Sequence, residues 1–172
     1  MSAEEEVEEH VHHAHDPFDK LVAGSMAIIA ALLAVVSVLG QHFNTEELLK
    51  QQQASDQWAF SQAKDIRRYS AQIASETLAA MKVDAKLQGK YAQDSSKYRQ
   101  QHDQIQEQAR DIEKERDASG RKANLFHFGE VFLEVAIVFS SLSILMKVRP
   151  LFFGGIAAAL AGIVIAATGW FA

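Results

Sequence analysis

Four ionisable side chains that could move protons or bind a cation occur beside or inside apolar stretches of the chain. Glu130 and Glu134 are four residues apart, and this spacing places both carboxyl groups on one face of a helix. His127 precedes Glu130 by about one helical turn, and His42 closes the first apolar stretch. Imidazole and carboxyl groups together serve in proton relays and in divalent-metal sites. We therefore treat these four residues as a candidate acid cluster.

A structural role is the alternative for the same carboxyl groups. In that interpretation Glu130 lies among lipid headgroups, whereas Glu134 is neutral and hydrogen-bonded to a neighbouring helix. The four residues do not form a complete ligand motif, and a sequence does not give the distances between helices. Both interpretations stay open at this stage.

The first nineteen residues, 1–19, combine a run of glutamates with four histidines: His10, His12, His13 and His15. Because this segment is acidic and has few apolar residues, we expect it to be a disordered tail. Neutral imidazoles bind transition metals, so the histidines are a candidate divalent-metal site. A solvated tail without a ligand is the alternative, and no other cofactor is expected.

Three apolar segments are long enough to cross a bilayer: 20–43, 128–146 and 151–172. The acidic leader lacks the basic start of a signal peptide, so the first segment is expected to remain as an anchor. Small residues recur at four-residue spacing, which allows close helix contacts within one chain or between copies. The pairs are Ala23/Ala27/Ala31, Gly155/Ala159, Ala158/Gly162 and Gly162/Ala166.

The polar segment 44–127 lacks proline and is rich in Gln, Ala and charged residues, a composition that favours helix. Two stripes with alternating steps of three and four residues predict coiled-coil packing. One stripe is Asp56, Ala59, Ala63, Ile66, Ser70, Ile73, Thr77 and Ala80; the other is Tyr91, Ser95, Tyr98, His102, Ile105, Ala109, Ile112 and Arg116.

Both ends of this polar segment must return to one membrane face if each flanking segment crosses once. Gly89 lies near the middle and suits the left-handed conformation that ends a helix. We therefore predict an all-α membrane protein with three transmembrane helices and a long antiparallel coiled-coil hairpin, with its turn near residue 89, between the first and second. A continuous helix bent at Gly89 is the alternative.

Trp58 and Phe60 occur several helical turns beyond the first apolar segment, too far from the bilayer for an interfacial aromatic belt. Packing between helices is the expected role. A partner-binding site is the alternative, because exposed aromatic residues are enriched at binding hot spots.

These aromatics belong to the run QASDQWAFSQAK at 53–64, just beyond the first apolar segment. The run resembles an uncharacterised bacterial membrane family, the domain of unknown function 4337 family. The likeness extends over about residues 20–170 and leaves out the acidic, His-bearing leader. The resemblance implies a three-helix membrane topology, and it supplies no established activity and no catalytic residues.

Several function classes are disfavoured by what the sequence lacks. No glycine-rich phosphate loop, nucleophile elbow or zinc-binding helix motif occurs, so an enzyme is not expected. Segment 44–127 has fourteen Lys or Arg and thirteen Asp or Glu, which gives no basic surface for nucleic acid. We expect a non-enzymatic, membrane-anchored helical scaffold or interaction protein that self-associates or binds another membrane or envelope protein. The alternative is a small ion or proton transport or channel-like assembly that uses Glu130 and Glu134.

The expected location is a bacterial inner (cytoplasmic) membrane. The short loop 147–150 carries Lys147 and Arg149, which favours a cytoplasmic loop and N-terminus with the hairpin outside. Arg116, Arg121 and Lys122 favour the opposite orientation. We give more weight to the short loop, because long loops translocate largely regardless of charge.

Overall fold

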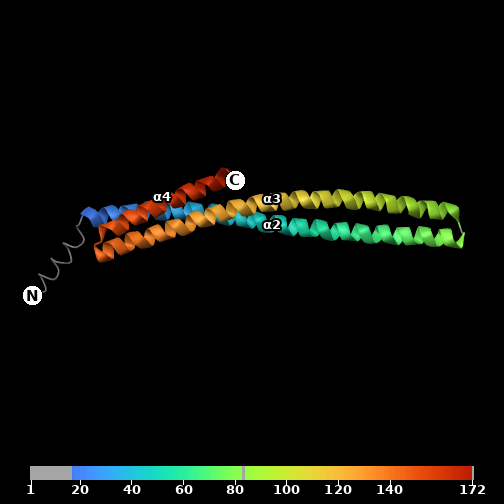
Figure 1. Cartoon of the computed structure of the whole chain (residues 1–172), viewed down its shortest axis with the longest axis horizontal. Coiled ribbons are helices and arrows are strands. Elements are labelled where there is room, and N and C mark those ends of the chain that lie inside the picture. The colour runs from blue at the N-terminus through green and yellow to red at the C-terminus, as the bar shows by residue number, and fades with distance from the viewer. Residues whose placement is uncertain (1–16, 83, 172) are drawn as a thin grey trace, which may run out of the picture. The chain divides into compact units, whose positions relative to one another are not determined.

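The computed structural model describes residues 17–82 and 84–171. Over these residues the chain forms three helices and no strand: α2 (Pro17–Met81), α3 (Ala85–Met146) and α4 (Arg149–Phe171) (Figure 1). The predicted all-α class is confirmed. Within the same residues, each helix includes a stretch that is long and apolar enough to cross a membrane, as the sequence indicated.

The two prolines of the chain lie at helix starts, where a missing N–H group costs nothing. Pro17 begins α2, and Pro150 is the second residue of α4. Between them no proline interrupts the backbone hydrogen bonds. As a result α2 runs unbroken from the apolar segment 20–43 into the polar residues that follow.

The break between α2 and α3 lies at residues 82–84, and not near Gly89 as the sequence suggested. Lys82 has a φ of 52°, and its N–H donates to Ala79 O at 3.2 Å, which closes the last turn of α2. The Asp84 carboxylate accepts hydrogen bonds from the N–H groups of Lys86 and Leu87, both at 3.1 Å. Asp84 therefore caps the start of α3, and Gly89 lies inside that helix.

The turn between α3 and α4 is as short as the basic loop 147–150 suggested. Lys147 has a φ of 53°, its N–H donates to Ile144 O, and the Val148 N–H donates to Ser143 O at 3.2 Å. These are the two hydrogen bonds of a Schellman helix end. The Ser143 hydroxyl also donates to Val148 O at 3.2 Å, and α4 begins at the next residue, Arg149.

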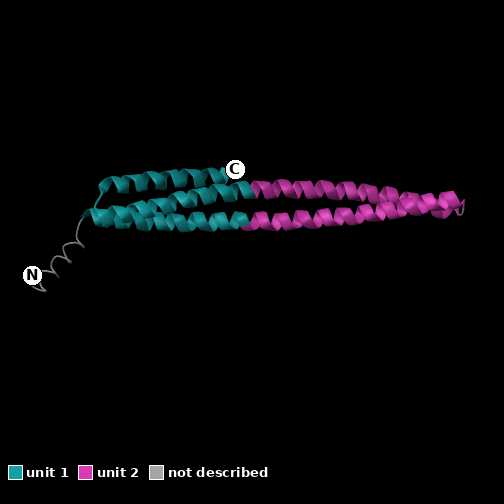
Figure 2. Cartoon of the chain, turned by 60° about the horizontal axis from the view of Figure 1, so that its bottom comes forward, with its two compact units in different colours: residues 1–44, 120–172 teal, residues 45–119 magenta. Residues whose placement is uncertain are grey.

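The chain divides into two compact units (Figure 2). Unit 1 comprises the described part of Met1–Asn44 with Gly120–Ala172, and unit 2 comprises Thr45–Ser119. Unit 1 therefore holds α4 and the apolar parts of α2 and α3, whereas unit 2 holds their polar parts.

In unit 1, α4 packs against α3 through a stripe of mostly small residues. The buried positions of α4 are Phe152, Gly155, Ala159, Gly162, Ala166 and Gly169. A Cβ atom on Gly162 would lie 2.7 Å from Gly129 O, and one on Gly129 would lie 2.8 Å from Gly162 O. Only hydrogen atoms fit between these backbones. The Gly/Ala spacing of α4 is thus used within one chain, whereas Ala23, Ala27 and Ala31 of α2 are exposed.

In unit 2, the parts of α2 and α3 lie side by side in both views (Figure 1, Figure 2). On α3, Ile105 and Ala109 are buried and the other residues of the predicted stripe are half-buried. On α2 the predicted stripe is wrong, because all its residues are exposed. The buried residues of this part of α2 are Ala54, Ser61 and Ala71, whose small side chains permit a close approach.

Candidate functional site

Glu130 and His127, both on α3, lie where α3 meets α2 in unit 1. Nδ1 of His127 lies 3.2 Å from Oε2 of Glu130, one turn further along α3. The side chain of Ser37, on α2, also faces the Glu130 carboxylate. Glu130 is half-buried, so two polar side chains cover a carboxyl group that the apolar surroundings would otherwise leave without partners.

A glycine allows His127 to lie against α2. A Cβ atom on Gly40 would be 3.3 Å from Phe126 Cβ and 3.5 Å from Nδ1 of His127. Phe126 is buried and stacks on Phe43 of α2, with ring centroids 5.5 Å apart. This apolar contact fixes the register of α3 against α2. As a result His127 lies beside Gly40, and Glu130 lies beside Ser37.

His42, the third expected member of the acid cluster, lies elsewhere. Its side chain is exposed, and its ring meets Phe43 edge-on at a centroid distance of 5.3 Å. Within residues 17–82 and 84–171, no hydrogen bond or ion pair joins His42 to Glu130, Glu134 or His127.

Glu134 is exposed on α3, one turn beyond Glu130. In the part of the chain that the structure describes, its carboxyl group has no hydrogen bond and no ion pair. The expected bond to a neighbouring helix of the same chain is therefore absent from these residues. The two carboxyl groups share a helix but not an environment.

Metal binding by the cluster finds no support in the geometry of the described residues. Among them, no group of three or more His, Asp or Glu side chains is placed to hold an ion. The other candidate metal site, formed by His10, His12, His13 and His15, lies outside the described residues.

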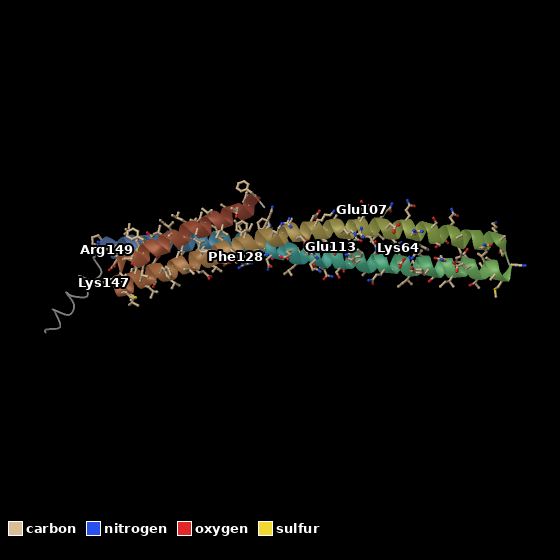
Figure 3. The ribbon with its side chains drawn as sticks, viewed as in Figure 1. Lys64, Glu107, Glu113, Phe128, Lys147 and Arg149 are labelled. Atoms are coloured by element: carbon tan, nitrogen blue, oxygen red, sulfur yellow. The ribbon has the colours of Figure 1, made fainter. Side chains whose placement is uncertain are left out.

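Trp58 and Phe60 have different surroundings in unit 2, because residues two apart on a helix point in nearly opposite directions. Trp58 is half-buried, and its Nε1 donates to Oε1 of Glu113 on α3 at 2.9 Å (Figure 3). Phe60 is 50% exposed, and Nζ of Lys64 lies 5.1 Å from its ring centroid. Packing between helices thus describes Trp58, whereas Phe60 alone remains available to a partner.

Sequence reasoning missed four residues that build these contacts: Ser37, Gly40, Glu113 and Gly129. Ser37 and the two glycines interrupt apolar stretches, and such interruptions can mark helix contacts. Nothing in the sequence distinguishes Glu113 from the many other charged residues of the polar segment.

Comparison with known proteins places the chain in a family. The family described as a domain of unknown function, DUF4337, matches residues 18–172. The chain belongs to this family. Searches of curated proteins and of solved structures gave no match.

The DUF4337 match covers all three helices of unit 1 and the whole of unit 2. It confirms the resemblance carried by residues 53–64. Because the family description names no activity, no catalytic or binding residue transfers to this chain.

Proposed function

We propose that this protein is a non-enzymatic, membrane-anchored helical scaffold that self-associates or binds another membrane or envelope protein. Its three apolar segments cross a bacterial inner (cytoplasmic) membrane. Its polar segment forms an antiparallel coiled-coil hairpin that presents an interaction surface. The helices of unit 1 anchor the chain, and unit 2 contacts the partner.

The observation that carries the proposal is a series of side-chain bonds between α2 and α3 in unit 2. Trp58 bonds to Glu113, Lys64 Nζ donates to Gln101 Oε1 at 3.0 Å, and Ser75 Oγ donates to Gln88 O at 3.2 Å (Figure 3). As the residue number rises on α2 it falls on α3, which is the order an antiparallel hairpin requires.

An ion pair extends this series toward the start of the polar segment. Lys50 on α2 binds Glu115 on α3, and Arg116 donates to Gln51 Oε1 at 2.7 Å. The hydrogen bond with Glu115 raises the pKa of Lys50 above its ordinary value of 10.5, which favours the charged form that the ion pair needs. Such bonds favour one register over neighbouring ones, because a shifted helix would separate the charges.

The proposed orientation places loop 147–150 in the cytoplasm and the hairpin outside. Lys147 and Arg149 lie at the turn between α3 and α4 (Figure 3). Positive charge in a short loop is retained on the cytoplasmic side.

Cysteine labelling tests both anchor and orientation, since the native chain has no cysteine. Lys90→Cys should react with a membrane-impermeant maleimide on intact spheroplasts, whereas Val148→Cys should react only after permeabilisation. The reverse pattern would contradict the orientation. Release of the wild-type protein from membranes by alkaline carbonate would contradict the anchor.

A second function, proton or cation transport, is favoured by one observation. Glu134 is exposed in an apolar segment and has no bond to another described residue. An ionisable group at such a position commonly marks an ion pathway, which here requires several copies around a common axis. Purified protein in liposomes should then conduct protons or cations, and Glu134→Gln should abolish the flux. A wild-type protein without flux would exclude this function.

A further inference from the structure

The polar part of α2 carries a regular stripe on a face that α3 does not cover. Its residues recur at steps of three and four, and we call them the outer stripe: Ala59, Ala63, Ile66, Ser70, Ile73, Thr77 and Ala80. All seven are exposed and none is charged, and the charged Asp56 lies one step before Ala59, where the uncharged stripe begins. Ile66 and Ile73 are 67% and 62% exposed, which is unusual for isoleucine in a water-soluble segment.

The contact with α3 uses a different face of α2. Ala54, Ser61 and Ala71 are the buried residues there, at 2%, 1% and 6% exposure. Two faces of α2 therefore have the residue pattern of a helix contact. The face with Ala54, Ser61 and Ala71 packs on α3, and the face with the outer stripe does not. The outer stripe has the spacing of a helix contact. Within the described residues, however, no helix packs against it.

The two helices of unit 2 differ strongly on their outward surfaces. The large exposed hydrophobic residues of this unit that lie on α2 are Leu48, Leu49, Phe60, Ile66, Tyr69, Ile73 and Met81, whereas α3 contributes Leu87. Exposed positions of α3 include Lys97, Lys114 and Glu107, the last of which is labelled in Figure 3. An apolar surface concentrated on one helix indicates a contact made by that helix.

The chemistry of the outer stripe restricts its partner. Alternating steps of three and four residues fit the knobs and holes of another α-helix. Because the stripe has no charge, the partner's contact face must also lack charge, since an unpaired charge buried there would be costly. The exposed face of α3 is charged, whereas the outer stripe of a second copy meets both conditions.

We propose that the outer stripe is a homodimer seam in which α2 of one chain packs in parallel on α2 of a second copy. This inference rests on the proposed membrane anchor. Two copies inserted in one orientation present their stripes parallel and at equal height, so that each residue meets its counterpart. Small Ala59, Ala63 and Ala80 permit close approach, and Ile66 and Ile73 supply the apolar contact.

Disulfide trapping in native membranes tests the seam with the full-length chain. Ile73→Cys should convert to a dimer under mild oxidation, because the two sulfur atoms face each other across a parallel seam. The matched control is Ala92→Cys, an exposed alanine on α3, which should remain monomeric. Equal trapping at both positions, or trapping of Ile73→Cys onto a different protein, would overturn the proposal.

Charge insertion gives a second and independent measurement. The double variant Ile66→Lys/Ile73→Lys should shift the native mass in mild detergent from dimer to monomer, while Ala92→Lys should stay dimeric. Helical content should not change, because both isoleucines are exposed in the single chain. A dimer that survives the double variant would overturn the seam. A monomeric wild type that remains in the membrane fraction would overturn the seam and leave the anchor intact, whereas a protein extracted by carbonate would contradict both.

Discussion

At the scale of single residues, Glu130 and Glu134 show that two carboxyl groups one helical turn apart can have different surroundings. A step of four residues rotates the side chain by about 40° around the helix. Glu130 falls on the edge that meets α2, where His127 bonds to it and Ser37 faces it, whereas Glu134 falls outside that contact. One helix therefore carries an acid with side-chain partners and an acid that has none among the described residues, and a single role for the pair is not supported.

Ser37→Ala should destabilise the protein, because it removes a hydroxyl of the neighbouring helix that faces the Glu130 carboxylate and can donate to it. A half-buried carboxyl that loses a hydrogen bond costs about 1–3 kcal/mol. The change should appear as a lower midpoint of thermal unfolding in detergent, followed by circular dichroism. Ser25→Ala is the control, because the Ser25 hydroxyl bonds only to Leu21 O of its own helix. Equal midpoints for the two variants would show that the Ser37 bond contributes nothing.

At the scale of helices, small residues decide which surfaces meet. Gly129 and Gly162 bring the α3 and α4 backbones together in unit 1, and the buried α2 residues of unit 2 are the small Ala54, Ser61 and Ala71. Large apolar residues such as Ile66 and Ile73 lie outside the contact. Small buried side chains on α2 with polar bonds around them, more than bulk hydrophobicity, characterise the α2–α3 contact of unit 2.

Gly162→Ala should weaken the packing of α4 on α3. The new methyl group would lie 2.7 Å from Gly129 O, so the helices must separate to admit it. Overpacking of this kind costs about 1–3 kcal/mol. The matched control is Gly154→Ala on the same helix, whose Cβ would meet Phe139 at an ordinary 3.5 Å. Comparison of unfolding midpoints in one detergent distinguishes the two, and a Gly162→Ala protein as stable as the control would refute the close contact.

At the scale of the whole molecule, apolar and polar parts are segregated between the two compact units. The candidate membrane segments belong to unit 1, and the segment with balanced charge forms unit 2. Outside the described residues, the chain begins with the acidic and His-bearing residues 1–16. Anchoring, partner contact and metal binding are therefore proposed for different parts of the chain.

Divalent-metal binding is expected at the N-terminal histidines His10, His12, His13 and His15, because neutral imidazoles bind transition metals. Titration calorimetry of the full-length protein with Zn²⁺ should show binding that disappears when His10, His12, His13 and His15 are replaced by alanine. His127→Ala is the control and should bind as the wild type does. Heat of binding that persists without the four histidines would point to another site.

The sequence alone determined the features that depend on local chemistry. Helical segments follow from composition, apolar spans from their length, and the α4 stripe from the spacing of Gly155, Ala159 and Gly162, because each depends on residues close together in the chain. The resemblance at residues 53–64 likewise identified the family that the comparison confirms.

Tertiary structure alone decided which faces meet and where the long helices break. The sequence favoured the α2 stripe with Ile66 and Ile73, whereas α3 packs on the face with Ala54, Ser61 and Ala71. It favoured a turn at Gly89, whereas Asp84 caps α3 earlier. Contact faces and side-chain partners such as Ser37 and Glu113 come from a second helix distant in sequence, so neither periodicity nor composition within one helix specifies them.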